Sequence, residues 1–193
     1  MWEHVGRLWT NGEPFLAVDA EIRSAWRGFS DDTYFDQVVH MGPEVTGISV
    51  GTGRGVLVGI DADLSDEGWV EVLVSDDGSI ALLYAAGATY RRILEAALAY
   101  PHDDDQRGET LEVPSRRLSI FSSALDGGGP HSVPFVEAQQ GRMPADEGVP
   151  TRGDDPGILI STVATRYQLK IRWYTDLDED GVFARWLFIP MID

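Results

Sequence analysis

Apolar and polar residues alternate most regularly in the stretch YQLKIRW, residues 167–173. A period of two places the apolar side chains on one face of a β-strand. A second apolar segment, residues 182–189, follows it, so we expect a long hairpin there. The connection DLDEDG, residues 176–181, begins like a calcium-binding loop. Its twelfth position is Leu187 rather than Glu and its flanks are strand-like, so we favour a solvated hairpin turn over a calcium site.

Upstream of this hairpin, residues 1–101 predict an α+β unit that consists of an antiparallel meander with two or three short helices. The expected strands are residues 15–18, followed by the four strands of the meander at 45–50, 56–60, 69–75 and 80–85. The expected helices are residues 20–27 after an Asp19 cap, 34–39 after acidic residues, and a helix capped by Thr89 that ends before Pro101.

The second part, residues 102–193, is expected to be β-rich and to end in the long hairpin. It begins with a charged, exposed link at 102–106, and strands are expected at 118–125 and 158–160. Between these strands lies a long loop, residues 126–157, with seven Gly and five Pro and a short strand at 133–136. The alternative is that both parts pack as one domain.

Charge and composition restrict the class of protein. The chain has 193 residues, 32 of them acidic and 15 basic, for a net charge of −17. Residues 1–105 hold 19 acidic residues and 6 arginines, a net charge of −13. Such a field repels nucleic acid and anionic lipid and favours a basic partner. The sequence contains no cysteine, which excludes disulfides and thiol chemistry. It shows no secretory signal or long apolar run, so we expect a cytoplasmic protein that does not bind membranes.

No motif predicts a catalytic, cofactor or metal site. The glycine-rich GTGRG, residues 51–55, resembles a phosphate-binding loop, but a strand follows it instead of a helix, so we favour a tight hairpin turn. The run HDDD, residues 102–105, offers metal ligands, yet a run of acids after a helix is more often a solvated linker.

The best candidate for a binding surface is the acidic segment that leads to Trp69. Its candidate partner-binding residues, with the two acids of the following turn, are Asp61, Asp63, Asp66, Glu67, Trp69, Asp76 and Asp77. A tryptophan beside acids can anchor a protein interface. The alternative interpretation is a solvated loop whose tryptophan opens a buried strand.

Several short motifs follow one another over residues 9–100: WTNGEP at 9–14, WRG at 26–28, GISVGTG at 47–53, GVLVG at 55–59, and the helix that follows Tyr84. Their order resembles the immunity protein 21 family of bacterial polymorphic toxin systems. The family has Gly-Asp-Glu-Pro after the second glycine-framed strand, where this chain has GIDAD at 59–63. The resemblance implies an antidote that binds a toxin and has no catalytic activity of its own.

We therefore expect an immunity protein that neutralises a cognate protein toxin by binding it. The acidic charge favours a basic toxin, and a nuclease fits because its nucleic-acid cleft must be basic. One alternative is an acidic α+β binding or regulatory module without a toxin partner. Another is a hydrolase with an unrecognised active site.

Overall fold

Two β-sheets make up most of the computed structural model, which describes residues 1–10, 12–28, 30–42, 45–59, 68–141, 156–177 and 181–191. The first sheet has the strand order β1 (Trp2–Thr10), β5 (Gly68–Ser75), β6 (Ile80–Gly87), β12 (Gly181–Pro190), β11 (Arg166–Leu177) and β7 (Gln106–Glu112). The second has the order β3 (Gly47–Val50), β4 (Gly53–Val58), β2 (Phe15–Asp19), β8 (Arg117–Ser122), β10 (Gly157–Ser161) and β9 (Phe135–Glu137). Neighbouring strands are antiparallel except β9 and β10.

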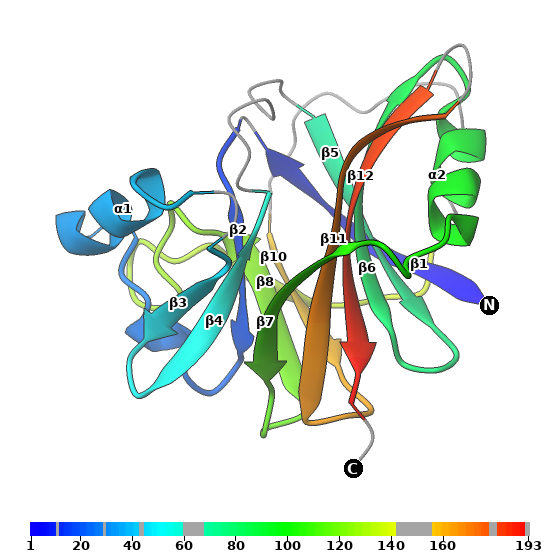
Figure 1. The fold of residues 1–193 in the computed structure, drawn as a ribbon. Helices are drawn as coiled ribbons and strands as arrows, with labels where there is room; N and C mark the ends of the chain where they lie inside the picture. Colours follow the sequence, from blue (N-terminus) through cyan, green and yellow to red (C-terminus); the bar gives the residue numbers. More distant parts are fainter. Residues whose placement is uncertain are drawn as a thin grey trace.

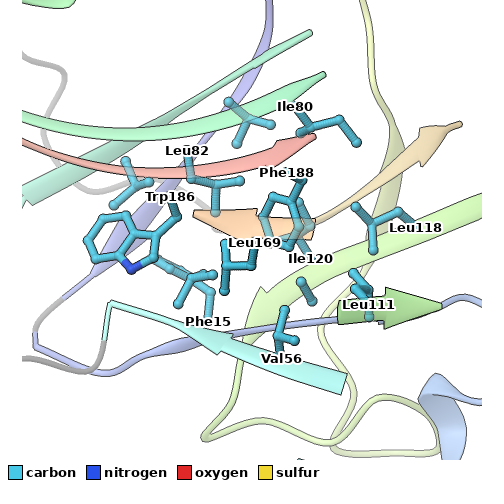
Figure 2. Packing of buried hydrophobic residues seen from close by; sticks show 14 of the residues in the cluster. Phe15, Val56, Ile80, Leu82, Leu111, Leu118, Ile120, Leu169, Trp186 and Phe188 are labelled. Carbon is cyan, nitrogen blue, oxygen red and sulfur yellow. The ribbon is translucent and has the colours of Figure 1, made fainter. Parts of the chain in front are cut away.

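The two sheets face each other across the main hydrophobic core. Side chains from both sheets meet there, among them Phe15 and Ile120 of the second sheet and Leu82, Leu169 and Trp186 of the first (Figure 2). On β11 the alternate residues Tyr167, Leu169 and Ile171 are almost fully buried. The predicted period of two and the β11–β12 hairpin are therefore confirmed.

Two helices cover the outer faces of the sheets on opposite sides of the molecule (Figure 1). Helix α2 (Tyr90–Ala99) packs Ile93, Leu94 and Ala97 against the first sheet. Helix α1 (Asp32–Val39) packs beside Trp26 over the second sheet, together with a short 3-10 helix, η1 (Arg23–Ala25). Because β12 has the core on one face and α2 on the other, its residues 183–188 are all buried.

The predicted α+β class holds, although strands dominate. The four-stranded meander is wrong, because β3 and β4 form a hairpin in the second sheet whereas β5 and β6 form one in the first. Each hairpin pairs as expected within itself, but β4 joins β2 and β5 joins β1. Local alternation predicts a hairpin without specifying its neighbour in the sheet. Each sheet contains strands from both sides of the predicted division at residue 101.

The predicted helix at residues 20–27 is also wrong, because only the three residues of η1 are helical. Asp19, its expected cap, is the last residue of β2 and is buried. Its carboxylate accepts hydrogen bonds from the backbone N–H groups of Glu21 and Ser115, both at 2.8 Å. The acid thus closes a turn and holds a distant loop instead of starting a helix.

The other two helices form near their predicted positions. Asp31 accepts a hydrogen bond from the Thr33 N–H at the start of α1. Thr89 occupies the cap position of α2 without a side-chain hydrogen bond. The GTGRG segment contains the tight β3–β4 turn at Gly51 and Thr52, with Gly51 at a φ of +55°, and its last three residues begin β4.

The link at 102–106 is not wholly exposed, since Asp105 is buried and β7 begins at Gln106. The long loop contributes β9 close to the expected short strand. Residues 142–155 of that loop lie outside the described residues, as do residues 178–180 of the calcium-like segment. Among the described residues, no helix is long and apolar enough to cross a membrane.

Candidate functional site

The turn between β5 and β6 carries a fixed, exposed carboxylate, that of Asp77. It accepts hydrogen bonds from the Ser75 hydroxyl and from the Ser79 N–H, the latter at 2.9 Å. The bond from Ser75, and then that from Ser79, holds the pKa of Asp77 below its usual value. Gly78 allows the turn with a φ of +82°. Asp77 therefore remains negatively charged at neutral pH in one defined position.

A hollow of about 210 Å³ opens beside this turn, and we call it the outer-face hollow. It lies on the face of the first sheet that also carries α2. Four of its lining residues are apolar, namely Trp2, Leu98, Leu187 and Ile189. The polar ones are Asp77, Ser79, His102 and Arg185. The hollow thus combines apolar walls with an anionic group.

Asp77 also lines a second hollow of about 360 Å³, which we call the end hollow. Its other lining residues are Arg116, Val163, Ala164, Thr165, Pro190 and Met191. Val163 is 62% exposed, which is unusual for a valine. Arg116 has a φ of 56° and donates a hydrogen bond to the Val163 carbonyl, which fixes the loop on this side. The Asp77 turn therefore borders both hollows.

The guanidinium group of Arg185, beneath the outer-face hollow, closes the end of α2. It donates to the carbonyl oxygens of Ala97, Tyr100 and Pro101 at 2.6, 2.8 and 3.1 Å. It also donates to the Asp105 carboxylate at 2.9 Å. The positive charge meets both the negative end of the helix dipole and a buried carboxylate. Its role is to hold the helix on the sheet.

Asp105 is shared between two arginines, because the Nε of Arg172 also donates to it at 2.6 Å. Arg172 also donates to the neighbouring Asp104, and this bond holds the pKa of Asp104 below its usual value. Two of the three carboxylates that the sequence offered as metal ligands, those of Asp104 and Asp105, are thus engaged by guanidinium groups.

A second buried charge cluster surrounds Glu71 on β5, which is fully buried. Its carboxylate accepts from Arg7 and from the Tyr90 hydroxyl, each at 2.9 Å, and lies 2.6 Å from Nε2 of His4. Burial, followed by the Glu71 charge, raises the pKa of Tyr90 far above its usual value. These bonds tie β1 and α2 to β5.

The predicted binding residues divide between several places. Asp61, Asp63, Asp66 and Glu67 lie outside the described residues. Trp69 is the second residue of β5 and is only 9% exposed, with its ring 5.0 Å from that of Trp9. Asp76 and Asp77 lie at the opposite end of β5, where the Asp76 side chain is 74% exposed. Of the described candidates, Asp77 lines the two hollows described above, whereas Trp69 and Asp76 line neither.

Sequence reasoning missed the apolar walls of the outer-face hollow. A signal for part of them existed, because Arg185, Leu187 and Ile189 have the spacing of one strand face within a strand that was expected. No comparable signal pointed to Trp2, since β1 was not expected.

Comparison with protein-family models, with curated proteins and with solved structures found no match.

Proposed function

We propose that this protein is an immunity protein that binds a basic protein toxin and neutralises it stoichiometrically. The resemblance of residues 9–100 to immunity protein 21 supports the class. The distribution of charge over the structure supports the basic character of the partner. We further propose that the protein acts by masking a surface of the toxin and that it catalyses no reaction itself.

The main supporting observation is that more than half of the twelve described arginines pair with carboxylates, whereas several exposed acids pair with no described cation. Ion pairs with carboxylates engage seven of them: Arg7, Arg27, Arg54, Arg91, Arg117, Arg172 and Arg185. By contrast, Glu21, Asp32 and Asp36 are exposed and form no ion pair with another described residue. The outward field is therefore negative.

Such a field accelerates the approach of a positively charged protein and repels nucleic acid. A nuclease toxin fits this field, because the surface with which it binds its substrate must be positively charged. An acidic protein seated on that surface competes directly with the phosphate backbone of the substrate. This argument favours a nuclease over a toxin that acts on membranes or proteins.

The proposal predicts a toxin gene beside this one, and the test is co-expression with that toxin. We expect growth to be restored and the two proteins to co-purify in equal amounts. The association rate should fall at least about tenfold between about 50 and 500 mM salt, because screening removes the steering. Failure of both rescue and co-purification would contradict the proposal.

A charge variant sharpens this test. The double substitution Asp32→Asn and Asp36→Asn removes two exposed charges from α1 and should slow association. Thr33→Ala on the same helix is the uncharged control and should leave the rate unchanged. Equal rates for both variants at low salt would show that this part of the field does not steer the partner.

A further inference from the structure

We propose that the outer-face hollow receives an apolar side chain of the partner while Asp77 binds a neighbouring Arg or Lys of the same segment. The inference rests on the proposed function for the identity of the partner, a basic protein. The inference specifies where that partner binds, and it identifies an apolar side chain and a neighbouring basic side chain as the partner's anchoring residues.

The size and lining of the hollow fit an apolar side chain. A cavity of about 150 Å³ lined by apolar side chains accommodates benzene, so a volume of about 210 Å³ can hold a leucine or phenylalanine side chain. Leu187 and Ile189 come from β12, Leu98 from α2 and Trp2 from β1. Because three elements that are packed together supply these walls, the hollow is formed before the partner arrives, which limits the ordering cost of binding.

The charges at the hollow favour a cation next to that apolar group. Arg185 is the lining residue that would oppose a cation, but it is 2% exposed and pairs with Asp105. Asp77, in contrast, is exposed, and its hydrogen-bond partners are neutral. The N-terminal ammonium also acts on Asp77, but it is bonded to Asp76. An incoming ammonium or guanidinium group therefore meets a carboxylate that forms no ion pair of its own with a described side chain.

The end hollow explains how an extended segment can continue past this point. Asp77 lines both hollows, so a cation bound to it has the outer-face hollow on one side and Val163 on the other. The exposed Val163 offers apolar contact to a further residue of the partner. The surface thus fits a segment in which a basic residue lies between two apolar ones.

The first test uses a probe that requires no toxin. Amide spectra of the ¹⁵N-labelled protein are recorded with N-acetyl-leucyl-arginine amide at about millimolar concentrations. We expect shifts at the Trp2 indole and at the Ser79 and Leu187 amides. N-acetyl-leucyl-glutamate amide and N-acetyl-glycyl-arginine amide should shift these signals much less. Equal shifts with all three peptides, or shifts confined to other surfaces, would overturn the proposal.

The second test uses variants with the cognate toxin. Asp77→Asn keeps an oxygen acceptor for the turn but removes the charge, and should raise the dissociation rate about threefold. Its matched control is Asp36→Asn, which removes the same charge from α1 on the other side of the molecule. Because the Asp36 charge acts on association, the control should change the dissociation rate less than Asp77→Asn does. Ile189→Trp fills the hollow and should weaken binding roughly tenfold or more.

The outcomes separate the two proposals. If the toxin is neutralised but Asp77→Asn and Ile189→Trp bind it as tightly as the native protein, the anchoring site is wrong and the proposed function stands. If no toxin is neutralised but the leucyl-arginine probe binds selectively at Trp2 and Ser79, the site stands and the partner is a basic protein of another kind. Thermal unfolding of each variant checks that it is folded.

Discussion

Replacing Arg185 by methionine should remove a large part of the stability of this protein. The guanidinium group makes four hydrogen bonds, three of them to the carbonyl oxygens that end α2 and one to Asp105. Methionine retains most of the volume but none of the donors. Breaking a buried ion pair by removing one partner costs about 3–5 kcal/mol, because the remaining charge stays buried. Asp105 keeps its bond from Arg172, so we expect about 3–4 kcal/mol rather than more.

The assay is urea unfolding followed by tryptophan fluorescence at neutral pH. With a urea dependence of about 1–3 kcal/mol per molar, the midpoint should fall by more than about 1 M. The matched control is Arg54→Met, which removes an exposed arginine whose partner Glu109 lies 3.7 Å away. That substitution should cost less than about 1 kcal/mol.

Asp105→Asn in the Arg185→Met background provides the critical comparison. Since the cost arises from a buried charge that has lost a partner, neutralising Asp105 should be less damaging there than in the native protein. A loss below about 1 kcal/mol for Arg185→Met, or strictly additive effects of the two substitutions, would refute the reasoning.

Three further substitutions test other parts of the structure. Burial keeps the phenol of Tyr90 protonated, so folding stability should fall as the pH rises above about 10, where unfolded tyrosine ionises. Tyr90→Phe should lower the free energy of unfolding by about 1 kcal/mol at neutral pH, because it removes the bond to Glu71. Between about pH 9 and 11, however, the stability of the variant should fall less than that of the native protein in urea titrations. Parallel pH curves would contradict this. Trp26→Phe should cost about 2 kcal/mol in the same titrations, because the buried indole N–H donates to a main-chain carbonyl at 2.8 Å, and a neutral effect would exclude that role. Gly78→Ala should cost about 2 kcal/mol, since its φ is +82° and its Cβ would lie 2.0 Å from Val163; an unchanged midpoint would show that the turn can shift.

Elements with a local signal were predictable from the sequence. The β11–β12 hairpin follows from strict alternation, and α2 follows from its apolar stripe and from Pro101 beyond its end. Strand β1 was not predicted, because its register shifts between His4 and Gly6. Val5 and Leu8, three residues apart, consequently contact the same core, which a period of two does not allow. Strand β7 has little apolar pattern, since Leu111 is its one buried residue.

Contacts between distant residues were not predictable, and they determine the candidate site. The local sequence Asp76-Asp77-Gly78 is enough to assign Asp77 to a turn. Its proximity to Trp2 could not be predicted, because it depends on the pairing of β1 with β5. Asp105 was interpreted as part of a solvated link because its partner Arg185 is 80 residues away. A single sequence shows the charge of such a residue without showing its partner.

The structure changes the meaning of the net charge. Asp19, Glu71, Asp105 and Asp126 are buried and bonded, so these four acids stabilise the fold and contribute little to an outward field. Three of them belong to residues 1–105, the part with the larger negative charge. The acids available to a partner are therefore a smaller set at defined positions. Among them Asp77 is held beside apolar hollows, and a carboxylate next to apolar surface can contribute affinity as well as attraction at a distance.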